Sequence, residues 1–527
     1  MQKNMLEWRL SERFQVAMVW EGVLVGLLAG CIVTFYRIAL TQAERLMRTF
    51  TEGAVGHPTL IALWFAILLL ILLVVSALML WEPYTVGSGI PQVDVEVMGH
   101  INQKWHRVIG AKFVEGTLLS LAGLSLGREG PAVQLGGMSG KAISRLLKRG
   151  RGEERILITC GAASGMAAAF HAPLTGVMFA IEEIHKTFSA PLVISVMVSC
   201  VCSDYFVSQV LGVDPVLSFT LAGALPHSTY YVLIIMGAVM GVLGALHNQG
   251  MFLAQKLYSR IQRRVPYARL AIPFAVAGVM AFTFPILCCG GGAIAQLLET
   301  LQRQPMSLLV MLLLGKYLFT TICFGSGAPG GTLFPLVIMG MIAGDMFGQV
   351  VCPQMGLDPS FVTNFLVLGI AGLFSGVVRA PVTAAVLVFE LTGSFDALLS
   401  VSIVSIAAYV TANLLKSDPF YERLVNNMLG TTEAERDYKF QSGEKILHTY
   451  IVGAGSFAEG RTIGDLRWPE SSLCITLTRS GREMVPNGET EIYALDRLLV
   501  IMDIKNEDEC DFRLRALTHG TIGYGGR

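Results

Sequence analysis

Residues 60–81 form an apolar run without a charged side chain, and this run limits the folds open to the chain more than any other feature. As a helix it is long enough to cross the roughly 30 Å hydrocarbon core of a bilayer. A helix also pairs its own backbone N–H and C=O groups, which have no water to bind in that core. The sequence therefore predicts a membrane-spanning helix here.

The rest of the 527-residue chain is also unusually apolar. Charged residues make up 15% and hydrophobic residues 53%, whereas about 25% of a soluble domain is charged. Many apolar segments are too long, and too rich in glycine and proline, for one continuous helix, so we expect helix pairs or broken helices. The predicted fold class is an all-α polytopic membrane protein. The segments are 16–36, 108–126, 156–184, 191–211, 230–257, 270–298, 307–350 and 361–415.

Basic residues gather in two short loops. Six Lys or Arg side chains fall within 141–155 and five within 256–269. The positive-inside rule places both loops, and with them both termini, in the cytoplasm. We expect a multi-pass protein of the cell (inner) membrane without a cleavable signal peptide. The formal net charge of zero gives no sign of nucleic-acid binding, and no nucleic-acid partner is expected.

The composition becomes more polar near Asp418, which indicates a second domain. Short apolar runs at 473–478 and 498–502 alternate with turns, as in a small α+β domain. We expect a membrane domain over 1–428, a linker over 429–444, a cytoplasmic α+β domain over 445–505 and a C-terminal tail over 506–527.

The membrane part contains an internal repeat. Residues 161–183 match residues 369–391, so that Glu182 aligns with Glu390. A Gly-x-x-x-Pro-x-x-x-x-Gly element precedes each copy, at 127–136 and at 331–340. Two halves with broken helices are typical of transporters whose ligand binds near the membrane midplane. The match alone does not say whether the repeat is inverted.

Three glycine and proline elements interrupt the apolar segments, at 87–91 (GSGIP), 127–131 (GREGP) and 330–335 (GGTLFP). Proline is tolerated in the first turn of a helix, where its missing N–H costs nothing. A helix start carries free N–H donors and partial positive charge. Three such starts meeting inside the bilayer would stabilise an anion that can still leave. The alternative is that each element is a simple helix break.

Several polar side chains lie beside these elements. Glu129 is a carboxylate inside the membrane region, where charge is costly and usually functional. It could occupy an anion site when ionised and leave it when protonated, or it could pair structurally with Arg128. Ser88 and Tyr421 offer hydroxyl donors, although for Tyr421 composition alone favours an interfacial tyrosine.

Three further charged residues lie within or at the end of apolar runs. Glu182 and Glu183 end an apolar run, and by themselves they fit interfacial carboxylates. Lys112 lies inside another run and is expected to snorkel or to pair with Asp94. The ten cysteines are scattered, and we expect buried small hydrophobes rather than metal ligands.

Together these motifs closely resemble the CLC chloride channel and transporter family. The resemblance rests on GSGIP, GREGP, GAASGMAAAFHAPLTGVMFAIEE, GAPGGTLFP and RAPVTAAVLVFELTG, which occur in the family's order and spacing over residues 16–428. It implies the CLC inverted-repeat fold with tilted, broken helices, assembled as a homodimer with one pore per subunit.

The resemblance also implies roles for residues. The Ser88 and Tyr421 hydroxyls and the backbone N–H groups of Thr332 and Leu333 would bind the central chloride. Arg128, Glu129 and Gly130 would form the outer site, with Glu129 as the gate. Glu183 matches the inner proton-transfer glutamate of antiporter members, and Glu182 precedes it on the proton path.

One position departs from the family. The pattern Gly-x-Phe-x-Pro has Leu333 at its aromatic position here, and Phe334 follows. Backbone donors would survive this change, whereas the aromatic lining, and with it rate and selectivity, would be altered. Ser88 is the residue of chloride-type members.

Residues 445–503 resemble a TrkA-C (RCK C-terminal) domain. The resemblance rests on EGRTIGDLRWPESSL and GREMVPNGETEIYALDRLLVIMD. It suggests cytoplasmic regulation by an unknown small ligand, and no residue is assigned to that ligand.

The predicted function is chloride/proton antiport, a secondary active exchange of anions without enzymatic chemistry, cofactor or metal. Glu129 together with Glu183 favours it over a passive voltage- or proton-gated chloride channel on the same scaffold. A ligand sensor with vestigial transport is the third possibility. The expected partners are chloride, protons, the lipid bilayer and a second copy of the chain.

Overall fold

The chain divides into two compact units, Met1–Met428 and Leu429–Arg527. Most of the linker expected over 429–444 lies outside the described residues. The computed structural model describes residues 2–186, 190–213, 217, 219, 221–261, 266–299, 303–430, 445–466, 468–469, 472–479, 482–503 and 506–519.

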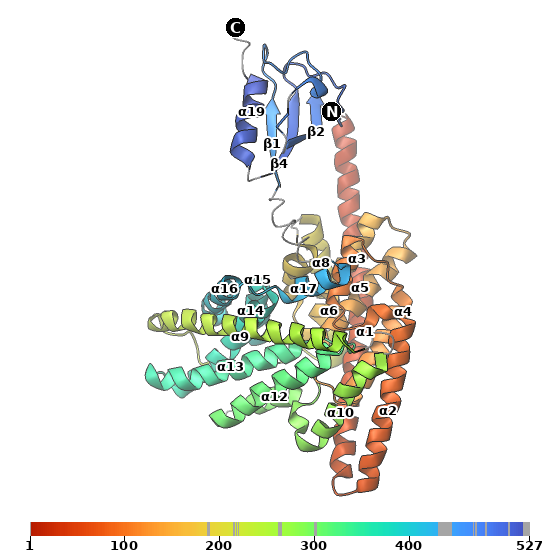
Figure 1. Ribbon diagram of the computed structural model, residues 1–527, viewed down its shortest axis with the longest axis vertical. Helices are drawn as coiled ribbons and strands as arrows, with labels where there is room; N and C mark the ends of the chain where they lie inside the picture. The colour runs from red at the N-terminus through yellow and green to blue at the C-terminus, as the bar shows by residue number, and fades with distance from the viewer. Residues whose placement is uncertain are drawn as a thin grey trace. The chain divides into compact units, whose positions relative to one another are not determined.

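Helices are the main secondary structure of the first unit over its described residues (Figure 1). Its first half contains α1 (Gln2–Ala54), α2 (Pro58–Trp81), α3 (Ile90–Met98), α4 (Trp105–Leu121), α5 (Glu129–Leu146), α6 (Arg151–Phe170), α7 (Pro173–Phe179), a π-helical turn (Ala180–His185) and α8 (Ala190–Leu211). Its second half contains α9 (Tyr230–Ser259), α10 (Pro266–Thr283), α11 (Gly292–Glu299), α12 (Met306–Gly325), α13 (Leu333–Gln354), α14 (Val362–Val378), α15 (Pro381–Thr392), α16 (Leu398–Leu414) and α17 (Phe420–Leu429).

Seven helices of the described chain are long and apolar enough to cross a membrane. The apolar run that defines the fold class is α2, the most apolar of these seven helices. The predicted polytopic helical fold is confirmed. The first span is longer than predicted, because α1 continues without a break to Ala54.

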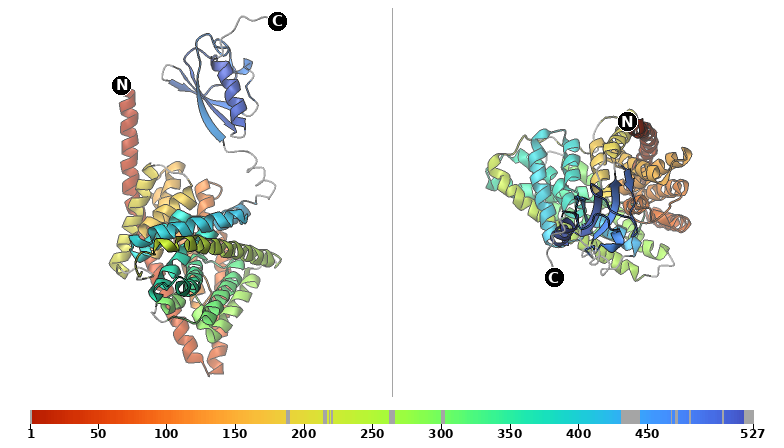
Figure 2. Two further views of the ribbon diagram at one scale, coloured as in Figure 1. Left: turned by 90° about the vertical axis from the view of Figure 1, so that its left-hand side faces the viewer. Right: turned by 90° about the horizontal axis from the view of Figure 1, so that it is seen from above.

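The internal repeat extends over nearly the whole unit. Packing partners recur in the same order: α5 packs on α6 and α1 on α8, while α13 packs on α14 and α9 on α16. Seen from above, the orange and yellow helices of the first half lie on one side and the teal helices of the second half on the other (Figure 2). The sequence match therefore detected only the best-preserved part of a larger repeat.

Glycines set the close packing of each half. A Cβ on Gly136 of α5 would collide with the Gly161 carbonyl of α6, and one on Gly161 would collide with the Gly136 carbonyl. The second half repeats this crossing, because a Cβ on Gly340 of α13 would lie 2.7 Å from the Gly369 carbonyl of α14. Small residues let membrane helices pack backbone to backbone, and here they fix the helices that carry the glycine and proline elements.

The second unit is a four-stranded antiparallel sheet with a helix. The sheet order is β1-β4-β2-β3, and Leu498 of β4 pairs with both Tyr450 of β1 and Leu477 of β2. All three side chains are buried in the core of this unit. The elements are β1 (Lys445–Ile451), β2 (Ser472–Arg479), β3 (Arg482–Met484), β4 (Arg497–Asp503) and α19 (Glu507–His519).

The prediction of a C-terminal tail over 506–527 is wrong for residues 507–519, which form the helix α19. This helix packs on β1 and β4, and Cys510 and Leu514 are buried in the domain core. The domain therefore continues past residue 505, because these apolar side chains complete its core. Residues 520–527 lie outside the described part of the chain.

Candidate functional site

The three glycine and proline elements meet at one place. The Gly127 N–H donates to the Gly331 carbonyl at 2.6 Å, and the Gly331 N–H donates back to Gly127 at 2.9 Å. The Gly330 N–H donates to the Gly87 carbonyl at 3.0 Å, and the Gly87 N–H donates to Gly327 at 3.1 Å. These bonds join the segments that lead into α3, α5 and α13. The three helix starts therefore meet, as the sequence analysis considered for an anion site.

Glycine is required where these backbones approach. A Cβ on Gly130 would lie 2.6 Å from the Ser88 carbonyl, and a Cβ on Gly331 would lie 3.0 Å from the Gly130 nitrogen. Gly89, the residue before α3, has a φ of +100°, a left-handed conformation that other residues rarely adopt. Close approach thus brings the starts of α3, α5 and α13 together.

Glu129 is the first residue of α5 and is fully buried. Its Oε2 accepts a hydrogen bond of 3.2 Å from the Phe334 N–H, in the first turn of α13. Its Oε1 lies 3.7 Å from the Arg128 Nε and has no hydrogen-bond partner among the described residues. The carboxylate thus occupies a helix start, where anions are stabilised by free N–H groups and partial positive charge.

Ser88 and Tyr421 are both buried below the surface, with 2% and 1% of their areas exposed. The two side chains lie beside each other, yet within the described chain the Ser88 hydroxyl has no partner at hydrogen-bonding geometry. The Tyr421 ring packs at right angles to Phe179, with centroids 6.5 Å apart. Tyr421 is therefore not an interfacial tyrosine, and a buried unpaired hydroxyl favours a polar ligand at this point.

Thr332 and Leu333 lie at the start of α13, and both are buried. Thr332 is the N-cap and Leu333 the first helical residue, positions whose N–H groups have no partner within the helix. The next residue, Phe334, has its ring 5.6 Å from the Arg128 guanidinium. Leu333 thus stands where the family motif Gly-x-Phe-x-Pro has its aromatic residue. The aromatic ring, now one residue later at Phe334, lies against Arg128.

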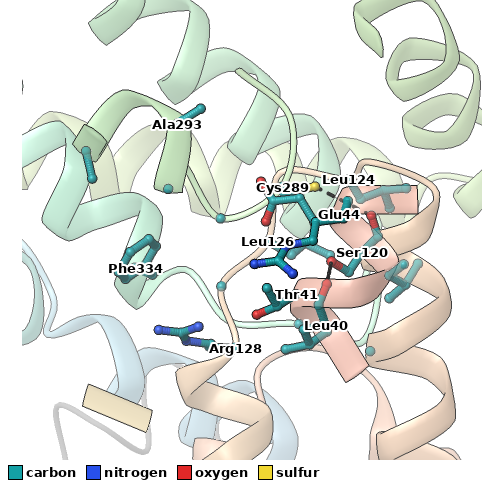
Figure 3. Close-up of a pocket in the computed structure, with 18 of the residues that line it drawn as sticks. Leu40, Thr41, Glu44, Ser120, Leu124, Leu126, Arg128, Cys289, Ala293 and Phe334 are labelled. Carbon is teal, nitrogen blue, oxygen red and sulfur yellow. Dashed lines mark hydrogen bonds between the residues drawn. The ribbon is translucent and has the colours of Figure 1, made fainter. Parts of the chain in front are cut away.

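A cavity of about 470 Å³ adjoins Arg128 and Phe334 (Figure 3). Three arginines line it, Arg45, Arg48 and Arg128, together with Glu44 and Glu299. Arg128 keeps 22% of its side chain exposed, whereas the Glu129 side chain is sealed off behind it. This cavity, called the vestibule below, thus reaches Arg128 and Phe334, the two residues that contact Glu129.

Sequence reasoning missed the vestibule. Glu44, Arg45 and Arg48 belong to the continuation of α1, beyond the residue at which the first span was expected to end. Glu44 and Arg48 form an ion pair of 2.8 Å one helical turn apart. A charged i, i+4 pair directly after an apolar helical run was the available signal.

Glu183 lies in the π-helical turn that continues α7, and only 5% of it is exposed. Such turns are frequent at functional sites. Asp94 of α3 and Tyr421 of α17 lie within electrostatic range of Glu183. Tyr421 is also within electrostatic range of Glu129. Tyr421 thus lies in the region between the two acids that the proposal below connects.

Glu182 turns away from these groups to the other half of the repeat. Its Oε2 accepts hydrogen bonds from the N–H and the hydroxyl of Thr383, both at 2.7 Å, and its Oε1 accepts one from the Val382 N–H at 3.2 Å. Both of its oxygens are therefore engaged at the start of α15.

Both expectations for Lys112 are wrong. It is fully buried, and its Nζ donates to the carbonyls of Thr85 and Gly87, each at 2.7 Å. Lys316 of α12 does the same in the second half, with bonds to Leu287 at 3.1 Å and Cys289 at 2.7 Å. By these hydrogen bonds the two lysines stabilise the turns that lead into α3 and α11. The sequence could not predict this role, because the carbonyls come from segments 25 to 29 residues away.

Comparisons with known proteins agree with this geometry. The family described as "Voltage gated chloride channel" matches residues 70–413, and the TrkA-C domain matches residues 447–510. An H(+)/Cl(-) exchange transporter ClcA of Vibrio cholerae is 31% identical over 81% of this chain and 93% of its own length. A protein of the same name from Yersinia pseudotuberculosis is 30% identical over 79% of this chain and 87% of its own.

Solved structures share the fold. A slow cyanobacterial Cl-/H+ antiporter superposes with a TM-score of 0.74 and 27% identity, over 79% of this chain and 98% of the other. A CLC-type fluoride/proton antiporter superposes with a TM-score of 0.61 and 21% identity, over 76% and 96% of the two chains.

Proposed function

The chain belongs to the voltage-gated chloride channel family, and we propose that it is a chloride/proton antiporter gated by Glu129. The observation that carries this proposal is the Glu129 carboxylate on the Phe334 N–H at the start of α13. The carboxylate occupies the start of α13, where free N–H groups would also stabilise a transported anion. Relatives named as H(+)/Cl(-) exchange transporters support exchange rather than passive conduction.

The central anion site would use donors without a full positive charge. The Ser88 and Tyr421 hydroxyls and the N–H groups of Thr332 and Leu333, at the start of α13, would bind chloride. Dipoles and hydroxyls stabilise an anion less than a buried ammonium would, so the anion can also leave. Gly130 and Arg128 would form the outer site with Glu129.

Protonation of Glu129 would open the path. The ionised carboxylate accepts the Phe334 N–H and competes with chloride for the same helix start. The neutral acid is a weaker acceptor, because charge-assisted hydrogen bonds are about twice as strong as neutral ones. A proton that reaches Glu129 thus releases the site to chloride, and the return of the carboxylate expels the anion.

Glu183 would pass protons between the cytoplasm and Glu129. It is a second buried acid, and both it and Glu129 lie within electrostatic range of Tyr421. A channel needs only one gating acid, whereas exchange needs a proton route separate from the anion route. Two acids therefore favour the antiporter.

The assembly and orientation belong to the same proposal. We place the protein in the cell (inner) membrane as a homodimer with one pore per subunit. The basic loops 141–155 and 256–269 support cytoplasmic termini. The TrkA-C domain would then lie in the cytoplasm, where a small ligand could regulate transport.

Flux from purified protein in liposomes tests the function. A chloride gradient should drive protons uphill until a pH difference forms across the vesicle membrane. Chloride flux without any proton movement would indicate a passive channel instead. Absence of both fluxes would indicate a sensor without transport.

A further inference from the structure

Glu390 mirrors the contacts of Glu182 across the repeat. Its Oε1 accepts a hydrogen bond from the Leu174 N–H at 2.7 Å. Its Oε2 accepts two from Thr175, from the N–H at 2.7 Å and from the hydroxyl at 2.6 Å. The acid near the end of α15 thus caps the start of α7, just as Glu182 caps the start of α15.

These reciprocal caps fix the relation between the halves. Each helix has its end against the start of the other, so α7 and α15 run antiparallel. Equivalent helices that run antiparallel are what an inverted repeat requires. Each acid follows its helix's first proline by the same spacing, from Pro173 to Glu182 and from Pro381 to Glu390.

The caps stabilise a segment that is weak by itself. The helix α7 has only 7 residues before its π-helical turn, and isolated helices this short are marginal. Three hydrogen bonds to a carboxylate, one of them from a buried threonine hydroxyl, anchor each end. An acid held by three donors is fixed in place and is not free to swing as a proton carrier.

We propose that Glu182 and Glu390 are positioning residues that lock α7 to α15 and so hold Glu183 in place for proton transfer. Glu183 directly follows Glu182, so the cap on Thr383 ties the backbone of Glu183 to the second half. The functional consequence rests on the proposed antiport. Glu182 then serves the proton path as its anchor, not as a carrier.

Substitutions on the donor side separate an anchor from a carrier. Thr383→Val removes one donor to Glu182 and leaves the carboxylate intact. Thr392→Val is the matched control, because the Thr392 hydroxyl on the same helix bonds to the Val388 carbonyl of its own helix at 2.8 Å. All variants are purified as full-length protein, and proton flux per chloride is measured in liposomes.

An anchor predicts that Thr383→Val and Glu182→Gln both lower proton flux per chloride, the former by about fivefold, the factor of a typical buried hydrogen bond. Glu390→Gln should lower it as well, although Glu390 is not on the proton path. Thr392→Val should match the wild type. A loss confined to Glu182→Gln, with Thr383→Val and Glu390→Gln unchanged, would overturn the proposal in favour of a carrier.

Thermal unfolding provides a test that needs no transport. Residues that share one interaction give non-additive effects in a double-mutant cycle. The double variant Glu182→Gln/Thr383→Val should lower the Tm by less than the sum of the two single changes, and Glu390→Gln/Thr175→Val should behave alike. Additive changes would refute the caps. If the wild type moves no protons, the proposed function fails and this cycle still decides the anchoring.

Discussion

The backbone N–H of Phe334 donates a hydrogen bond of 3.2 Å to Oε2 of Glu129, and this bond joins the two halves of the repeat at their broken helices. Phe334 belongs to α13 and Glu129 to α5. In the repeat, Glu129 aligns with Leu333, and each is the first residue of its helix. The second half thus begins its helix with an uncharged residue. The helix break itself therefore does not require an acid, which is consistent with the gating role proposed for Glu129.

Glu183→Gln should separate the two fluxes. The amide cannot carry a proton, while the anion donors at Ser88 and the start of α13 are untouched. We expect chloride flux to persist and chloride-driven proton movement to be lost. Paired chloride-electrode and pH recordings on the same liposomes measure this. Coupled proton movement at the wild-type ratio would remove Glu183 from the proton route.

Ser88→Ala and Tyr421→Phe should weaken chloride binding. Each change deletes one hydroxyl donor, and a net 0.5–1.5 kcal/mol per hydrogen bond corresponds to a roughly two- to tenfold higher Kd. Isothermal titration of the purified protein with chloride measures the Kd, and Thr392→Val serves as the control for loss of a hydroxyl elsewhere. Unchanged affinity in both variants would place the central anion at other donors.

Gly136→Ala should destabilise the membrane unit. The new methyl group would collide with the Gly161 carbonyl, and overpacking of this kind costs about 1–3 kcal/mol. Gly110→Ala in α4 is the matched control, since a Cβ there meets nothing within 4 Å and alanine is about 0.5–1 kcal/mol better than glycine within a helix. Thermal unfolding in detergent should lower the Tm of the first variant alone. Equal Tm values would show that this crossing tolerates a side chain.

Truncation should distinguish the two boundaries of the C-terminal domain. Ending the chain after residue 505 removes Cys510 and Leu514 from the core, and loss of a buried leucine alone costs about 2–5 kcal/mol. Ending it after residue 519 keeps α19 whole. Limited proteolysis should therefore cleave the shorter domain much faster, while ion exchange by the membrane unit survives both cuts. Equal protease resistance would make α19 dispensable for the fold.

The sequence predicted the features that depend on local chemistry. Glycine and proline in GSGIP, GREGP and GGTLFP mark helix starts because only these residues permit such breaks, and Glu129 stood out because charge is costly in a membrane. The polytopic fold and the small α+β domain followed from hydropathy and turn spacing alone.

Contacts between distant segments could not be predicted in this way. Glu182 binds residues about 200 positions away in sequence, and Lys112 binds carbonyls whose orientation depends on the turn before α3. The alignment of Glu182 with Glu390 was visible in the repeat, but its meaning required the antiparallel packing of α7 and α15. Hydropathy gave no reason to extend α1 to the vestibule residues Glu44 and Arg48.

Chloride-driven proton transport by Glu129→Gln tests the proposed gate most directly. Glutamine resembles the protonated acid in shape and cannot exchange a proton. In liposomes with a chloride gradient, the wild type should drive protons uphill, whereas Glu129→Gln should pass chloride passively and leave the pH unchanged. Protons driven uphill by Glu129→Gln at the wild-type ratio would contradict the account, because the gate would then lie elsewhere.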